Sequence, residues 1–91
     1  MRTFHLTVLT PGGTLFDGEA SKLRVRTALG EMGILAGRLP VAAALAPESL
    51  VSFESDGEAK SLRAGGGYVH VQREKTSVLL TGGEWVDSVG G

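Results

Sequence analysis

Apolar and polar residues alternate along much of this 91-residue chain, which is the pattern of half-buried β-strands. The alternation is clearest in segments 4–9, 22–26 and 69–72. An antiparallel sheet with one buried and one solvated face produces this pattern. We therefore expect three of the strands here, and we expect their apolar positions to face the core: Phe4, Leu6, Val8, Leu23, Val25, Val69 and Val71.

Turn-forming residues break the chain at intervals of about 6–10 residues. The strongest turn signal is Asp56-Gly57, which separates the strand-like runs 50–55 and 58–64. Asp-Gly between two such runs predicts a β-hairpin, because both central residues of its tight turn need a positive φ. Gly30-Glu31-Met32-Gly33 is likewise interpreted as a turn between strands.

Helix competes with strand in one segment, Val41 to Leu45, whose alanines have high helical propensity. The segment is too short for an independent helix and is followed closely by Pro47. We interpret it as a buried strand. Many short strands with frequent glycine turns predict an all-β fold, a roughly ten-stranded flattened β-sandwich or barrel with no helix longer than about two turns.

The composition narrows the function classes. With 42% apolar residues and a formal charge of −1, the chain resembles neither a disordered protein nor a nucleic-acid binder. It has no cysteine, and so neither a disulfide framework nor a thiolate metal site. No apolar run approaches the roughly 20 residues that span a bilayer, so we expect no direct membrane insertion. We expect one domain over 1–84 and a short, partly disordered tail over 85–91.

Candidate catalytic groups are sparse. The two histidines, His5 and His70, fall on the polar faces of expected strands and form no Ser-His-Asp set or metal-ligand spacing. Asp17 and Glu19 flank Gly18 and are interpreted as turn and strand-end residues. We therefore expect no catalytic residue, no metal and no cofactor.

The glycine cluster 65–67 superficially resembles a phosphate loop. It is followed by a strand-like segment and has neither the helix nor the Lys-Ser/Thr pair of such a loop. The glycines instead suit a tight turn with close approach of another backbone. Whether they also form part of a partner surface is left open by the residues alone.

Four segments, taken in order and at their spacing, resemble the amino-terminal domain of the epsilon subunit of F-type ATP synthase. They are Thr10–Glu19, Gly30–Pro40, Ala64–Val71 and Thr76–Leu80. The resemblance covers about residues 3 to 81. It implies a non-catalytic central-stalk subunit that binds gamma and the c-ring and couples ion-driven rotation to ATP synthesis. It also implies a peripheral position at the cytoplasmic face of a bacterial membrane.

The family's contact residues map onto two groups. The loop facing the c-ring corresponds to Glu31 and Met32. The gamma interface corresponds to Arg38, Leu39, Pro40, Gly66 and Tyr68. From the residues alone, Glu31 could simply be solvated, Met32 could belong to the core, and Arg38 could be an exposed loop residue.

The chain departs from the family pattern at three positions. Ala36 and Arg38 stand where the family usually has Pro and His, and His70 stands where it has Glu. An Arg at position 38 could pair with a carboxylate of gamma. Full-length relatives carry two further helices that brake ATP hydrolysis, and a chain of this length is expected to act without braking and without binding ATP.

An alternative of a different class is a stand-alone small β-sandwich that binds a small molecule or peptide at a sheet edge. A deep apolar pocket would favour this alternative. Association with ATP synthase subunits would favour the rotor subunit.

Overall fold

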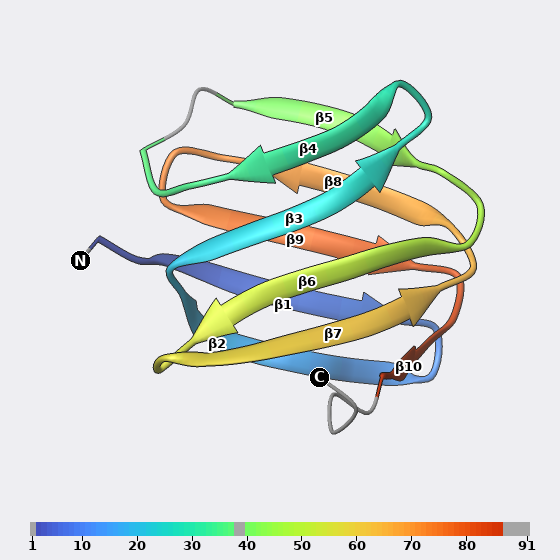
Figure 1. Cartoon of the computed structure of the whole chain (residues 1–91), viewed down its shortest axis with the longest axis horizontal. Coiled ribbons are helices and arrows are strands. Elements are labelled where there is room, and N and C mark those ends of the chain that lie inside the picture. Colours follow the sequence, from blue (N-terminus) through green and yellow to red (C-terminus); the bar gives the residue numbers. More distant parts are fainter. Residues whose placement is uncertain (1, 38–39, 87–91) are drawn as a thin grey trace.

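The computed structural model describes residues 2–37 and 40–86, and within them it contains ten β-strands and no helix (Figure 1). The all-β expectation is confirmed. The strands are β1 (Phe4–Thr10), β2 (Gly13–Ala20), β3 (Lys22–Thr27), β4 (Gly30–Ile34), β5 (Val41–Leu45), β6 (Ser49–Ser55), β7 (Glu58–Ala64), β8 (Gly67–Val71), β9 (Lys75–Leu80) and β10 (Gly83–Trp85).

The strands form one hydrogen-bonded sheet in the order β10-β7-β6-β3-β5-β8-β9-β1-β2, and β4 pairs with β3 beside this path. The sheet folds over between β3 and β5, which share only the pair Thr27–Leu45. Two layers result: β4, β3, β6, β7 and β10 form one, and β5, β8, β9, β1 and β2 form the other (Figure 1). The expected flattened sandwich is therefore confirmed.

The core lies between the layers and is made by the alternating apolar positions. All seven residues expected to face the core are buried. Most core side chains are Val, Leu or Ile, each worth about 1.5–3 kcal/mol when fully buried. Three aromatic rings lie next to one another beside this core. The ring centroids of Phe16 and Phe53 are 4.6 Å apart, and those of Phe53 and Trp85 are 6.1 Å apart.

Buried polar side chains tie the strands together at points where backbone pairing is incomplete. The hydroxyl of Ser49 donates to the Arg26 carbonyl at 3.0 Å and accepts from the Arg26 amide at 3.2 Å. The hydroxyl of Ser55 donates to the Glu19 carbonyl at 2.7 Å and so links β6 to β2 across the layers. Within the described residues, no buried side-chain nitrogen or oxygen lacks a hydrogen-bond partner.

The Asp56-Gly57 hairpin is confirmed. These two residues connect β6 to β7 with φ values of 52° and 77°, as a two-residue hairpin turn requires. The expected boundary between residues 84 and 85 falls inside β10, which runs through Trp85 and pairs with β7. Residues 87–91 of the expected tail lie outside the described residues.

Two segments differ from the sequence-based expectation. Residues 30–33 belong to β4, and the turn before them is formed by Ala28 and Leu29. The hydroxyl of Thr27 sets this turn, since it donates to the Gly30 carbonyl and accepts from the Leu29 amide. The prediction of a turn at 30–33 was wrong, because Gly30 and Gly33 both lie within β4 and the hydrogen bonds that stabilise the turn come from the Thr27 hydroxyl.

Segment 41–45 is a strand, as expected, but only Leu45 is buried. The strand lies where the sheet folds over, so Ala43 is only half-buried against the core and the other three side chains are exposed. Asp17 and Glu19 both lie within β2, opposite β1. Glu19 is the second-last residue of the strand, in agreement with the strand-end expectation, whereas Asp17 does not lie at a turn. Gly18 between them does not interrupt this strand.

Candidate interaction surfaces

The outer face of the layer β5-β8-β9-β1-β2 carries a line of apolar side chains, which we call the apolar row. Its members are Ala44, Tyr68, Leu79 and Leu9, and neighbouring strands place them side by side in register. Tyr68 is 46% exposed and Leu79 is 47% exposed. Alternation along the strands explains the row, because its members sit between the inward-facing core positions.

A second feature lies on the same outer face, where β1 meets β2. We call it the acid–histidine corner, and it consists of Thr3, His5, Asp17 and Glu19. His5 Nε2 lies 2.5 Å from Asp17 Oδ1, and His5 Nδ1 lies 3.2 Å from Glu19 Oε2. Thr3 Oγ1 donates to Glu19 Oε1 at 2.8 Å. Cross-strand pairing puts His5 directly opposite Glu19, which explains the contact.

The turn between β3 and β4 forms a third surface feature, the hairpin tip, made of Ala28 and Leu29. Leu29 is 100% exposed, although the Thr27 hydroxyl holds the turn in place. The tip lies at the Ala44 end of the apolar row, since the Ala28 amide donates to the Ala44 carbonyl at 3.4 Å. The sequence signal for this feature was a large apolar residue immediately before a turn glycine.

The residues predicted to face the c-ring lie beside this tip. Glu31 is an exposed residue of β4, paired in register with Arg26, and its Oε1 lies 3.9 Å from Arg24 Nε. Met32 points the other way and packs against the core. Met32 is half-buried there, and Leu29 is a fully exposed apolar residue at this end.

The residues predicted to contact gamma do not meet at one point. Arg38 and Leu39 lie outside the described residues. Pro40 precedes β5 at one end of the β5–β8 ladder, whereas Gly66 precedes β8 at the other end. Tyr68 is the one that projects from the outer face as part of the apolar row. The two ends of a five-residue ladder are about 13 Å apart, so a partner must cover the face lengthwise to touch both.

The glycine cluster behaves as expected from the sequence. A Cβ on Gly67 would collide with the carbonyl oxygen of Leu79 and approach Leu80 Cα to 2.9 Å. The carbonyl of Gly66 accepts a hydrogen bond from the Thr81 amide at 3.0 Å. Close approach of the β9 backbone therefore explains why glycine occupies position 67.

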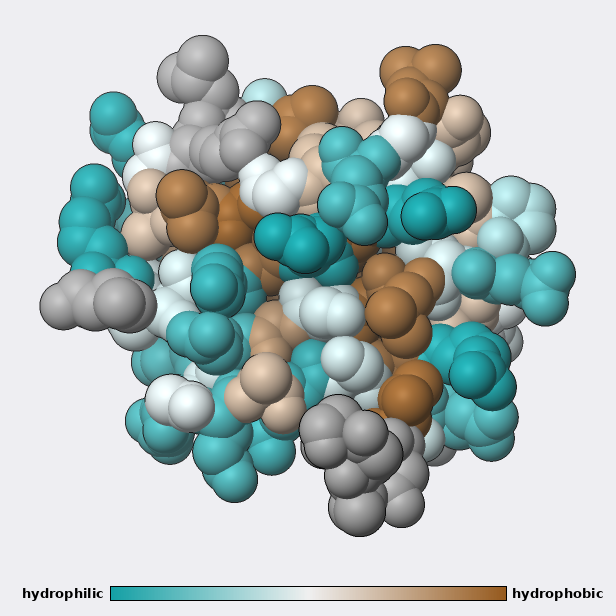
Figure 2. Space-filling model, in the orientation of Figure 1, coloured by the Kyte–Doolittle hydropathy of each residue, from teal (hydrophilic) through white to brown (hydrophobic). Residues whose placement is uncertain are grey.

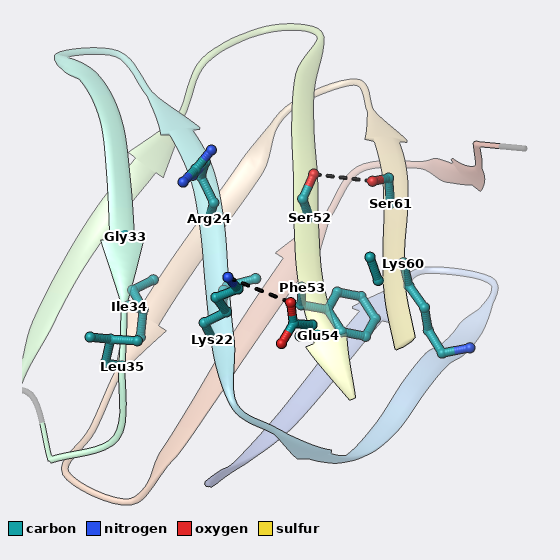
Figure 3. A pocket seen from close by; sticks show the side chains of 12 residues that line it. Lys22, Arg24, Gly33, Ile34, Leu35, Ser52, Phe53, Glu54, Lys60 and Ser61 are labelled. Atoms are coloured by element: carbon teal, nitrogen blue, oxygen red, sulfur yellow. Dashed lines mark hydrogen bonds and ion pairs between the residues drawn. The ribbon is translucent and has the colours of Figure 1, made fainter. Parts of the chain in front are cut away.

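A groove of about 500 Å³ crosses the outer face of the other layer, over β3, β4, β6 and β7 (Figure 3). Its lining includes Lys22 paired with Glu54 at 3.5 Å, and Ser52 bonded to Ser61 at 3.1 Å. In the space-filling view of this side, hydrophobic side chains lie in separate groups among hydrophilic ones (Figure 2). The groove is open to solvent, and its lining mixes these charged and hydroxyl groups with apolar side chains such as Leu35 and Phe53, so it is not the deep, enclosed apolar pocket that the small-molecule alternative requires.

Across residues 2–37 and 40–86, the structure brings no three histidine or carboxylate side chains into a metal-binding group. The same residues include no helix long and apolar enough to cross a membrane. His5 contacts a different carboxylate with each of its two ring nitrogens.

Comparison with known proteins identifies the family. Residues 3–86 match the family described as "ATP synthase, Delta/Epsilon chain, beta-sandwich domain". An ATP synthase epsilon chain of Caldanaerobacter subterraneus subsp. tengcongensis is 31% identical over 88 residues, which cover 97% of this chain and 64% of the relative. An ATP synthase epsilon chain of Bacillus cytotoxicus is 34% identical over 84 residues, which cover 92% of this chain and 62% of the relative.

A solved structure of the Euglena gracilis mitochondrial ATP synthase, comprising OSCP, F1 and c-ring, contains the same fold. Its matching chain superposes with a TM-score of 0.85 at 22% identity, over 97% of this chain and 58% of that one. The chain thus spans less than two thirds of these relatives. The match over residues 3–86 includes all ten strands, and the chain belongs to the ATP synthase delta/epsilon family through its β-sandwich domain.

Proposed function

We propose that this chain is a non-catalytic rotor subunit of an F-type ATP synthase, which binds gamma and the c-ring and transmits ion-driven rotation to ATP synthesis. The family match over residues 3–86 is the observation that carries the proposal. A second solved structure of the same fold is titled as the central stalk and c-ring of the Tetrahymena thermophila mitochondrial enzyme, with a TM-score of 0.76. Bacterial relatives support a peripheral position at the cytoplasmic face of the cell membrane.

The physical character of the domain suits torque transmission. A sandwich whose layers share a close-packed core resists deformation, since protein interiors have low compressibility. Most strands are joined by turns of a few residues, so the two ends of the domain move as one body. Such a body needs two separate contact surfaces rather than a reactive site.

We assign the gamma contact to the outer face that carries the apolar row. Tyrosine is enriched at interfaces because its ring contributes a large apolar area and its hydroxyl remains able to hydrogen-bond. Leu79 lies beside Tyr68 in register and is added to the predicted contact set. Pro40 and Gly66 lie at the two ends of this face, and Arg38 and Leu39 remain predictions from the resemblance.

We assign the c-ring contact to the hairpin tip and the neighbouring Glu31. Leu29 offers a fully exposed apolar anchor, and Glu31 offers a negative charge for complementary docking. Met32, which is half-buried against the core, remains a prediction from the resemblance.

The chain offers a matched pair of variants to test the gamma assignment. Leu79→Glu places a charge on the apolar row, and Leu50→Glu places the same charge on the opposite layer, where Leu50 is 50% exposed. Burying an unpaired carboxylate in an interface costs several kcal/mol. We therefore expect Leu79→Glu to weaken binding to purified gamma by at least about tenfold, and Leu50→Glu to leave it unchanged. Equal effects of the two variants would contradict the assignment.

The c-ring contact has its own readout. We expect Glu31→Lys and Leu29→Asp to reduce ATP-driven proton pumping in membranes rebuilt with the variant chain, while gamma binding stays intact. Loss of gamma binding in these variants would show that the tip and the apolar row are one surface.

A further inference from the structure

Leu29 is the most exposed large apolar side chain among the described residues, and it stands on a turn that one neighbouring side chain holds in place. The turn joins β3 to β4 with only two residues, Ala28 and Leu29. The Thr27 hydroxyl donates to the Gly30 carbonyl at 2.8 Å and accepts from the Leu29 amide at 3.1 Å. A single hydroxyl therefore bonds to the backbone at two points of the turn.

The backbone of this turn explains why such a hold is needed. Two-residue hairpin turns favour positive φ, because the resulting turn matches the twist of the flanking strands. The Asp56-Gly57 turn has this geometry, with φ values of 52° and 77°. Ala28 and Leu29 do not, since neither has a positive φ. A tip that carries a leucine thus lacks the favoured geometry, and the Thr27 hydroxyl supplies hydrogen bonds that stabilise it.

The same arrangement occurs at the turn between β1 and β2. The Thr10 hydroxyl donates to the Gly13 carbonyl at 3.1 Å and accepts from the Gly12 amide at 3.2 Å. This turn presents only Pro11 and Gly12 to solvent, whereas the other presents Leu29. The chain therefore contains a matched turn, with the same two hydrogen bonds and no projecting leucine.

A leucine on a rigid turn binds more tightly than one on a mobile loop. Fully burying a leucine side chain strengthens binding by about 10–150-fold. Ordering a mobile side chain on binding gives back about 2–10-fold of such a gain, and a turn that is already ordered avoids this loss. Because Leu29 is 100% exposed, a partner buries it fully only by surrounding it, which requires a recess rather than a flat face.

We propose that Thr27 is a positioning residue that holds Leu29 ready for insertion into an apolar recess of the partner at the hairpin tip. The identity of that partner as the c-ring rests on the proposed function. Thr27 acts through Leu29 and makes no contact with the partner itself. The contact surface of the ring is therefore expected to present a recess of about the size of one leucine side chain.

The hold of Thr27 on the tip can be measured without a partner. In NMR relaxation of the full chain, the Leu29 amide should have an order parameter of about 0.85, and Thr27→Val should lower it below about 0.6. Thr27→Ser keeps the hydroxyl and should keep the wild-type value. Thr10→Val should loosen the Gly12 amide and leave the Leu29 amide rigid. A rigid Leu29 amide in Thr27→Val would overturn the inference.

The use of the tip can be measured in bacterial membrane vesicles stripped of their native epsilon subunit. The readout is the concentration of the full chain that gives half-maximal restoration of ATP-driven proton pumping. We expect Leu29→Ala to raise this concentration about tenfold and Thr27→Val to raise it about 2–10-fold, while the Kd for purified gamma stays unchanged. Thr27→Ser and Thr10→Val should behave like the wild type. The hydrogen bonds of both hydroxyls are exposed, so both valine variants should fold.

Two results of this assay would also overturn the inference. One is a wild-type concentration for Thr27→Val although its tip has become mobile, and the other is an equal rise for Thr27→Val and Thr10→Val. Failure of the proposed function would be recognised differently. Wild-type behaviour of Leu29→Ala would show that the tip is not the c-ring contact, and absence of any restoration by the wild-type chain would refute the rotor assignment.

Discussion

Replacing Gly67 with alanine should severely destabilise the domain, because β8 comes close to the backbone of β9 at this residue. A Cβ would collide with the Leu79 carbonyl oxygen and lie 2.9 Å from Leu80 Cα. Both obstacles are backbone atoms, so no side-chain rotation can relieve them. The residue also has a φ of +153°, where a Cβ adds strain of about 1–3 kcal/mol. Moving β8 away from β9 would weaken ladder hydrogen bonds worth about 1 kcal/mol each.

Together these effects give a loss of about 4 kcal/mol in the free energy of unfolding. A domain of this size has roughly 5–14 kcal/mol in total, and each kcal/mol shifts Tm by about 4–8 °C. We therefore expect thermal unfolding, followed by circular dichroism, to show a Tm about 15–30 °C lower. Gly82→Ala is the control, since Gly82 has no atom within 4 Å of an added Cβ. A Tm within about 5 °C of the wild type for Gly67→Ala would refute the close-approach interpretation of the glycine cluster.

Three further substitutions test other parts of the fold by urea unfolding. Leu62→Ala empties a fully buried site and should cost about 2–5 kcal/mol; a loss below about 1 kcal/mol would contradict its core position. Ser49→Ala should cost about 1–3 kcal/mol, because it leaves the Arg26 amide without its hydrogen-bond acceptor and removes one of the two donors to the Arg26 carbonyl, which keeps the Ala46 amide; no loss would mean that the Arg26 amide finds another partner. Lys22→Ala should cost less than about 1 kcal/mol, since its ion pair with Glu54 is exposed to solvent; a larger loss would show that the groove depends on this pair.

The sequence predicted the fold well, because local patterns and tertiary burial agree in most strands. Alternation in 4–9 identified the buried positions of β1, and Asp56-Gly57 identified the β6–β7 hairpin. Patterns of this kind depend on one strand or one turn at a time. They fail where a residue's surroundings come from other parts of the chain, as at β5, where three of the five side chains are exposed although a buried strand was predicted.

The candidate surfaces were harder to predict. The sequence can suggest that Tyr68 is exposed, but only strand register brings Leu79 and Leu9 beside it, from segments far apart in the chain. The same holds for the acid–histidine corner, since His5 meets Asp17 and Glu19 only through β1–β2 pairing. Glu31 was correctly expected at the surface, whereas Leu29 was missed because the turn was placed two residues too late.

The most direct test of the rotor assignment is restoration of coupled ATP synthesis. Bacterial membrane vesicles stripped of their native epsilon subunit would be rebuilt with this chain, and ATP synthesis driven by an imposed ion gradient would be measured. The account predicts that the wild-type chain restores synthesis, that Leu79→Glu restores little, and that Leu50→Glu performs like the wild type. Failure of the wild-type chain to bind the stripped complex, or binding without any recovery of synthesis, would contradict it.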